Sequence, residues 1–421
     1  MIVRYLSKAA ATNAWGTIAL RGSIVAVNFA VMIGLAAFLG LQAFGALAVV
    51  WGLAMIAGTA LSGGAPLLLL QQLTDGQGMS TRGLFFQLFA LPAGLAILAF
   101  GLLQTVFPAG DVLAVLAGGL AINLATCLAS IMRALGSVWA SMVLRDAMPQ
   151  VALGLAGVTT LGAPAATVLI HAVLGLGLIC AFTVPWCIRH RRWGEMTSIN
   201  GRAGGVAWSL WATSLSGMVL AQIDVVVGGS ILSAEQIGLY AVLKRVANLV
   251  ALPVSVATWV SAKPVSSAFG GGDTYRLQTE SARGSQIAFI PGFVLLVAAL
   301  AAIPFLDNLI AQNVESDGRF AFLAFALGAF LQIFFASSFT VATLCGQAMG
   351  AAMSRVVSIA IYLFIIFTVG SGMSIFAHAC AYVAANTIGI LLLWRHLRNR
   401  LGIDTSAAVA WRKTGALWKP S

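Results

Sequence analysis

Apolar segments long enough to cross a bilayer fill most of this sequence of 421 residues. A helix needs about 20 apolar residues to span the hydrocarbon core, and twelve segments meet or approach that length. Their approximate ranges are 14–39, 44–64, 84–107, 112–132, 147–162, 166–187, 206–230, 236–260, 286–306, 319–344, 355–371 and 375–396. Only 8% of the residues are charged and 60% are hydrophobic, so the chain has too little polar surface for a soluble exterior. The sequence predicts an all-α polytopic membrane protein with about 12 transmembrane helices.

The net charge of +11 reports the orientation of the chain and does not indicate a nucleic-acid partner. With the N-terminus placed in the cytoplasm, nearly all Lys and Arg residues of the loops fall on the cytoplasmic side, and Arg319 is the exception. The opposite loops carry acids such as Glu235 and Asp307. This asymmetry follows the positive-inside rule. It predicts an even number of spans, with both termini in the cytoplasm.

A basic connection that begins at Arg189-His190-Arg191-Arg192 divides the expected helices into six and six. We therefore expect an N-terminal six-helix bundle over residues 1–188, a cytoplasmic linker over 189–205, a C-terminal six-helix bundle over 206–397 and a cytoplasmic tail over 398–421. Phe44-Gly45-Ala46-Leu47-Ala48 is similar to Ile237-Gly238-Leu239-Tyr240-Ala241, and both open the second helix of their half. Such a repeat predicts two bundles that face each other across a central cavity.

Four ionisable residues lie well inside the expected spans: Arg21, Asp224, Lys244 and Arg245. An ionisable group at this depth is costly, so it usually faces an aqueous cavity or a partner of opposite charge. Asp224 and the Lys244-Arg245 pair lie at similar depths on consecutive antiparallel helices. We expect an ion pair between them.

Tyr240, Lys244 and Asn248 recur every four residues and share one side of their helix with Arg245. Two interpretations stay open. In the first, Asp224 neutralises one cation and the cluster only fixes helix packing. In the second, the cluster lines the cavity, and its net positive charge attracts an anionic substrate. The candidate substrate-binding residues are Arg21, Asp224, Tyr240, Lys244, Arg245 and Asn248.

The remaining chemically distinctive residues receive simpler interpretations. The five cysteines lie in or beside apolar segments without CxxC spacing, so we expect packing residues and neither a disulfide framework nor a metal site. His378 is expected to be a packing or interfacial residue. Arg133, Arg145 and Asp146 flank the expected loop between residues 132 and 147 and are interpreted as headgroup anchors. No catalytic residue and no cofactor are expected.

Residues 222–246 resemble a known signature. Gln222-Ile223-Asp224, Gly228, Ile237-Gly238-Leu239-Tyr240-Ala241 and Lys244-Arg245-Val246 look like the corresponding stretch of polysaccharide translocases of the Wzx or PST type. These belong to the multidrug/oligosaccharidyl-lipid/polysaccharide exporter superfamily.

The resemblance implies a flippase of the bacterial plasma membrane that works by alternating access. Its substrate would be a polyprenyl-pyrophosphate-linked oligosaccharide destined for surface polysaccharide. It also implies contacts with membrane lipids and with polysaccharide polymerase or export proteins. In this interpretation Arg21, Lys244 and Arg245 contact the pyrophosphate, and Asp224 tunes their field or takes part in a coupling step with H⁺ or Na⁺.

The sequence also bears on three other functions. A cation-coupled drug exporter of the same superfamily would need an acid in the first helix, where this chain carries Arg21. A major-facilitator porter would carry a charged loop between its second and third helices, and residues 74–82 match that pattern poorly. A membrane polysaccharide polymerase or ligase would carry a large outer loop with Arg and His, which this chain lacks. The sequence therefore favours a transporter over an enzyme.

Overall fold

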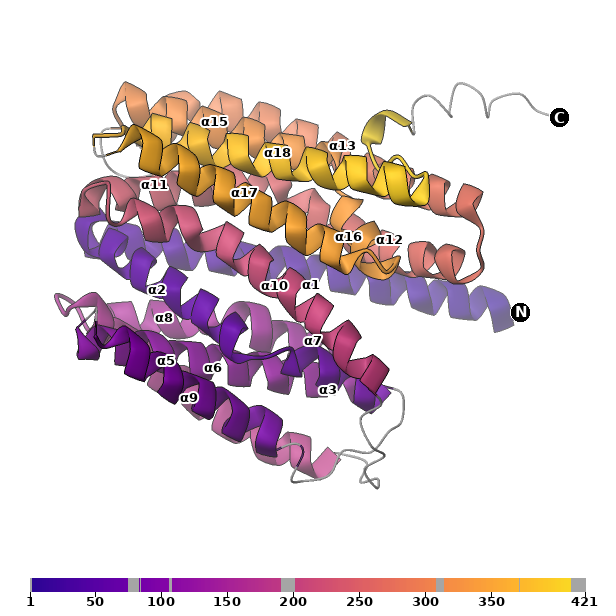
Figure 1. Cartoon of the computed structure of the whole chain (residues 1–421), viewed down its shortest axis with the longest axis horizontal. Coiled ribbons are helices and arrows are strands. Elements are labelled where there is room, and N and C mark those ends of the chain that lie inside the picture. Colours follow the sequence, from indigo (N-terminus) through magenta and orange to yellow (C-terminus); the bar gives the residue numbers. More distant parts are fainter. Residues whose placement is uncertain are drawn as a thin grey trace. The chain divides into compact units, whose positions relative to one another are not determined.

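The computed structural model describes residues 2–74, 83, 85–105, 108–190, 201–307, 314–370 and 372–409, and every regular element within these ranges is a helix (Figure 1). Eleven of the described helical stretches are long and apolar enough to cross a membrane. The chain forms two compact units, Met1–Trp211 and Ala212–Ser421. The prediction of an all-α polytopic membrane protein with two helical bundles is confirmed.

The first unit is built around α6, which packs against α2, α3, α5 and α9. Its elements are α1 (Ile2–Leu39), α2 (Leu41–Leu61), α3 (Ala65–Thr74), the π-helix η1 (Phe86–Ala90), α5 (Leu91–Leu103), α6 (Ala109–Ala134), α7 (Val138–Met142), the π-helix η2 (Val143–Ala147), α8 (Met148–Thr159) and α9 (Ala165–His190). Small residues allow α2 and α6 to approach closely. A Cβ added to Gly119 would lie 2.9 Å from the Gly58 backbone nitrogen, a contact that no side chain tolerates at this crossing.

The fifth expected span begins earlier than the sequence predicted. The range 147–162 corresponds to α8, but α7 and η2 precede it without a break, so the helix starts at Val138. Arg145 and Asp146 therefore lie within a helix, in its π-helical turn, and the loop expected before residue 147 is wrong. The two charges could be placed there because they pair with each other, with Arg145 Nε 2.7 Å from Asp146 Oδ1.

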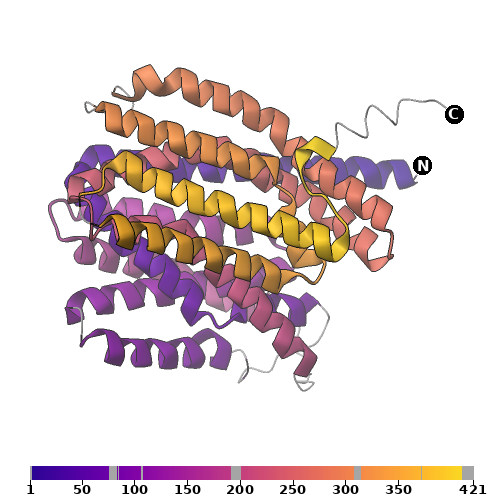
Figure 2. The same cartoon turned by 45° about the horizontal axis from the view of Figure 1, so that its top comes forward.

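The second unit packs α15 against α11, α13 and α18, and α18 against α17. α10 (Gly201–Gly228) begins in the first unit and continues into the second. The elements that follow are α11 (Ala234–Ala247), the 3₁₀-helix η3 (Asn248–Ala251), α12 (Leu252–Gly270), α13 (Thr274–Ala302), the 3₁₀-helix η4 (Ile303–Phe305), α15 (Ser316–Phe334), α16 (Ser338–Leu344), α17 (Ala348–Val369) and α18 (Ile375–Leu401). The helices coloured orange to yellow run side by side in both views (Figure 2).

The start of α11 is fixed by its own sequence. Ser233 accepts a hydrogen bond from the Gln236 backbone, and the Gln236 side chain accepts one from the Ser233 backbone, which completes a capping box. α11 then ends in η3, and Pro253 stands in the first turn of α12. The single expected span 236–260 is thus two α-helices joined by a tighter turn. Proline is tolerated there because the first turn lacks intrahelical acceptors for its N–H groups.

The chain after α18 packs onto the second unit. Gly402 ends α18 in the left-handed conformation, with φ of 67°. The C-terminal strap, residues 403–407, then buries Ile403, Thr405 and Ala407. The Thr405 carbonyl accepts a hydrogen bond from Ser285 Oγ at 2.7 Å. The range 398–421 was expected to be a tail, but the described part begins inside α18 and continues as this buried strap; residues 410–421 lie outside the described residues.

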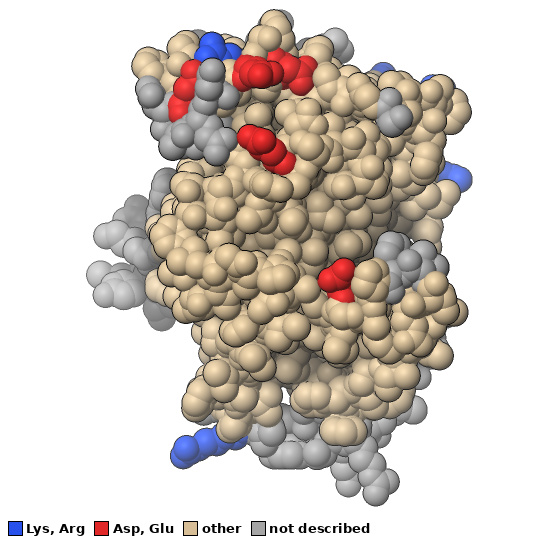
Figure 3. Space-filling model, turned by 90° about the vertical axis from the view of Figure 1, so that its left-hand side faces the viewer, with Lys and Arg blue, Asp and Glu red and all other residues tan. Residues whose placement is uncertain are grey.

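Charge separates between the two ends of the second unit. The end where α11, α15 and α18 begin carries acids, including Glu235 and Asp317, and Asp317 accepts a hydrogen bond from the backbone of Phe376. Figure 3 shows acidic side chains gathered on one face with few basic ones beside them. The opposite end carries Arg398 and Arg400 in the last turn of α18. This separation matches the charge asymmetry on which the orientation was predicted.

Candidate functional site

A buried ion pair joins α10 to α11 in the second unit. Lys244 Nζ donates to Asp224 Oδ1 at 2.7 Å and also lies 2.7 Å from Oδ2. The Tyr240 hydroxyl donates to Asp224 Oδ2 at 2.7 Å, and Lys244 donates further to the Ala221 carbonyl at 2.8 Å. The side chains of Lys244 and Asp224 are only 9% and 0% exposed. The ion pair expected from the sequence is present.

Aromatic side chains and one histidine enclose this pair. Lys244 Nζ lies 4.4 Å from the centre of the Tyr382 ring, a cation–π contact that suits a buried ammonium. Tyr240 packs edge-on against Phe325 and His378, each with ring centres 4.9 Å apart. The Tyr362 hydroxyl lies 3.1 Å from His378 Nε2. We call Asp224, Tyr240, Lys244, Tyr362, His378 and Tyr382 the polar core of the second unit.

The hydrogen bonds fix the protonation of His378. Its Nε2 lies 2.9 Å from the Asp224 backbone carbonyl, which can only accept, so Nε2 carries the hydrogen. The His378 Nδ1 atom is buried and makes no hydrogen bond. Gly228 makes this packing possible, because a Cβ there would lie 3.0 Å from His378 Nε2 and 2.6 Å from Ile237 Cδ1.

The residues that share one side of α11 differ in burial. Tyr240 and Lys244 are buried inside the unit because they pair with Asp224 and its aromatic neighbours. Arg245 is half-buried and lies near enough to Lys244 for their charges to repel. Asn248 is exposed at the start of η3. Of these residues, only Arg245 and Asn248 reach the surface of the described structure.

Arg21 belongs to a second charged cluster, in the first unit. Its half-buried side chain lies within electrostatic reach of Asp146, Arg145 and Arg133. Arg145 donates two hydrogen bonds to Asp146, at 2.7 and 3.0 Å. Asn28, two helical turns after Arg21, donates to the Asp146 backbone carbonyl at 2.8 Å and ties α1 to η2. We call Arg21, Arg133, Arg145 and Asp146 the cationic cluster; three cations against one acid leave it net positive.

Sequence reasoning missed members of both clusters. Arg133, Arg145 and Asp146 were interpreted as headgroup anchors, and His378 as a packing residue. Tyr362 and Tyr382 were not considered. His378 and Tyr382 are four residues apart on α18, so they share one helix face; that spacing of polar groups within an apolar span was the available signal. Nothing comparable in the sequence links Arg21 to residues 133–146, because only packing brings α1, α6 and η2 together.

The polar core is already complete in its charges. Both carboxylate oxygens of Asp224 are engaged, one by Lys244 and the other by Tyr240 and Lys244. The ammonium therefore occupies the place that a metal cation would take beside this carboxylate. Among the described residues, no group of three His, Cys, Asp or Glu side chains converges as a metal site would.

The fold has well-defined relatives among solved structures. An inward-facing multidrug resistance transporter of the MATE family, in the MOP superfamily, aligns over 91% of this chain and 98% of its own, with a TM-score of 0.65 and 14% identity. The MATE multidrug transporter DinF-BH, solved as a complex, aligns over 91% and 94%, with a TM-score of 0.67 and 15% identity. An outward-facing MATE transporter aligns over 92% and 94%, with a TM-score of 0.58 and 14% identity.

No protein-family model and no curated protein sequence matches the chain. At these identities the structural likeness defines the fold: the chain has a multi-pass helical fold similar to that of these solved MATE transporters.

Proposed function

We propose that this protein is an alternating-access translocase that moves an anionic lipid-linked oligosaccharide, of the polyprenyl-pyrophosphate type, across a bacterial plasma membrane. The observation that carries the proposal is the cationic cluster. Arg21, Arg133 and Arg145 lie together on three elements of the first unit, with Asp146 as their acidic partner. Guanidinium groups suit phosphate oxygens because they donate several hydrogen bonds in a fixed geometry.

Lys244 has a different part in this proposal. It is held inside the polar core, so the residues of the second unit offered to an anionic substrate are Arg245 and Asn248. Asp224 would then act through Lys244, either by shaping the field around Arg245 or in a coupling step. A coupling proton could break the Asp224–Lys244 pair without any metal, whereas Na⁺ would have to displace the ammonium.

The runner-up is a cation-coupled exporter of small cationic molecules. It is favoured by the solved relatives, which are described as multidrug transporters. A site for a cationic drug requires a carboxylate with spare negative charge. Here Asp224 is neutralised by Lys244, and Asp146 is paired with Arg145 and surrounded by further arginines. Neither carboxylate therefore has spare negative charge for a cation, and the net positive charge of the cationic cluster favours an anionic substrate.

Substitutions in the cationic cluster separate the two functions. Arg21→Gln and Arg133→Gln are expected to leave the membrane abundance of the protein near that of the wild type and to reduce surface polysaccharide at least about tenfold, because charge-assisted contacts to the substrate are lost. Arg319→Gln is the matched control, since Arg319 pairs with Asp307 elsewhere in the chain. Normal polysaccharide at normal abundance would contradict the flippase proposal.

The same strains can be tested for efflux of a lipophilic cationic dye. Efflux that depends on this protein and survives Arg21→Gln would favour the drug exporter.

The orientation of the chain is tested separately. A cysteine placed in residues 191–200 should resist a membrane-impermeant thiol reagent in intact cells, because both termini and this connection are proposed to be cytoplasmic. Polymerase or export proteins of the polysaccharide pathway are the proposed partners.

A further inference from the structure

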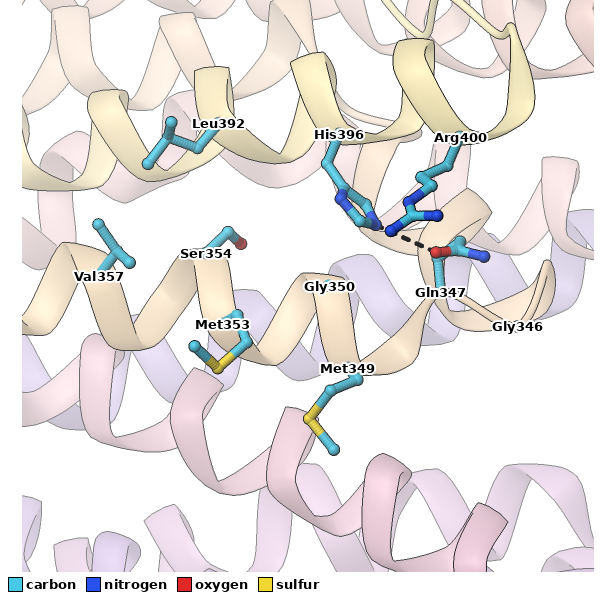
Figure 4. Close-up of a pocket in the computed structure, with 10 residues that line it drawn as sticks. All are labelled: Gly346, Gln347, Met349, Gly350, Met353, Ser354, Val357, Leu392, His396 and Arg400. Atoms are coloured by element: carbon cyan, nitrogen blue, oxygen red, sulfur yellow. Dashed lines mark hydrogen bonds between the residues drawn. The ribbon is translucent and has the colours of Figure 1, made fainter.

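A pocket of about 480 Å³ lies between α17 and α18 of the second unit. None of its lining residues belongs to the polar core or to the cationic cluster. Its volume falls within the range of small-molecule sites in proteins. The lining residues are Gly346, Gln347, Met349, Gly350, Met353, Ser354, Val357, Leu392, His396 and Arg400 (Figure 4). These ten residues include two basic groups and no acid.

One end of the pocket is polar and basic. His396 Nε2 lies 3.0 Å from Gln347 Oε1, an acceptor, so Nε2 carries the hydrogen. The Arg400 guanidinium lies beside this pair in Figure 4. Gly350 is required here, because a Cβ would lie 2.6 Å from His396 Nε2. The N-terminus of α17 adds the positive end of its dipole. The features at this end all favour an anion.

The other end of the pocket is apolar and lies deeper in the span. Val357 is ten residues along α17 from Gln347, which is about 15 Å at 1.5 Å per residue. Leu392 lies two helical turns before Arg400 on the antiparallel α18 (Figure 4). Leu392 is 40% exposed and Met353 54% exposed. Both helices are apolar enough to span a membrane, so this end of the pocket lies at the depth of acyl chains.

We propose that this pocket binds one anionic phospholipid, with its phosphate at Arg400 and an acyl chain along Val357 and Leu392. Charge complementarity and depth carry the assignment. The basic groups stand at the end of α17 and α18, where headgroups lie, and the apolar wall runs inward from them as an acyl chain does. A free anion would use the polar end alone and would leave the apolar wall unoccupied.

The test uses the purified full-length protein in a neutral detergent. Dioctanoyl phosphatidylglycerol, dioctanoyl phosphatidylcholine and inorganic phosphate are titrated separately, with intrinsic tryptophan fluorescence and native mass spectrometry as readouts. Phosphatidylglycerol is expected to bind at least about tenfold more tightly than phosphatidylcholine, since it lacks the quaternary ammonium and keeps its net charge. Equal binding of the two lipids, or equal binding of inorganic phosphate and phosphatidylglycerol, would overturn the proposal.

Two matched pairs of variants locate the site. Arg400→Gln is expected to remove the preference for phosphatidylglycerol, whereas Arg395→Gln, an equal charge change on an exposed residue outside the pocket, keeps it. Leu392→Trp is expected to weaken both lipids by filling the apolar end. Leu391→Trp changes a neighbour with 41% exposure outside the pocket and should not. If either control behaved like its partner, the lipid would not bind in this pocket.

Discussion

Each unit contains an ion pair between an aspartate and a cation that lie in helices, but the side chains of the two pairs differ in their exposed fractions. In the second unit the side chains of Lys244 and Asp224 are 9% and 0% exposed, and hydroxyl and aromatic groups complete the shell. In the first unit the side chains of Arg145 and Asp146 are 38% and 31% exposed, and further arginines surround them. The comparison teaches that charged pairs within helices can differ in burial and in charge balance: one pair is enclosed and neutral, and the other is partly exposed and surrounded by further cations.

Breaking the closed pair should have the largest effect. Asp224→Asn or Lys244→Met alone is expected to lower the free energy of unfolding by about 3–5 kcal/mol, because each leaves a buried group without its partner. Thermal unfolding in detergent, read from the loss of monodisperse protein, measures this. The double variant removes both charges and should recover most of the loss. A double variant as unstable as the sum of the singles would show that the two residues are not coupled.

The next largest effect is expected where α2 and α6 cross in the first unit, if that crossing is as tightly packed as the polar core of the second unit. Gly119→Ala is expected to cost about 1–3 kcal/mol, because its new methyl group would press on the Gly58 backbone and on Ala57. Gly94→Ala on α5 is the control: a Cβ there meets nothing within 4 Å, so higher helix propensity should leave stability unchanged or raised. Similar thermal unfolding of both variants would contradict the close crossing of α2 and α6.

Asp404 lies in the C-terminal strap, and its side chain is half-buried. Burial alone would raise its pKa, but hydrogen bonds from the Trp394 indole and from Ser406 bring the pKa below its usual value. A lowered pKa contributes stability above the unfolded-state pKa, and that stability is lost as pH falls through the folded-state pKa. We expect thermal stability to fall below about pH 4 more steeply in the wild type than in Asp404→Asn. Parallel pH profiles would contradict this.

The open pair should have the smallest effect on stability. Asp146→Asn is expected to change the free energy of unfolding by less than about 1 kcal/mol, because a solvated pair gains little net energy. The variant makes the cationic cluster more positive, so any change in export should exceed the change in thermal stability. A decrease in the free energy of unfolding as large as that of Asp224→Asn would show that the two pairs stabilise their units equally, and it would contradict the contrast between them.

The sequence predicted the spans, the two halves and the Asp224–Lys244 pair because these depend on local properties. Apolar run length defines a span, and two charges at equal depth on neighbouring antiparallel helices have few other partners. The start of the fifth span was missed because Arg145 and Asp146 look like loop residues until their mutual pairing is known. The C-terminal strap was missed for a similar reason: the buried carbonyl and hydroxyl of Thr405 are paired with Ser285 and Ser338, which lie 120 and 67 positions away.

By itself the sequence determined that this chain crosses a membrane many times, that it divides into two halves, and which charges lie inside it. Tertiary structure alone decided how those charges are used. It closed Lys244 into an aromatic shell built from α11, α15, α17 and α18, and it gathered Arg21, Arg133 and Arg145 from three elements into one cluster. The physical reason is that the energy of a charge in a membrane protein depends on its neighbours and its access to water, and helix packing sets both.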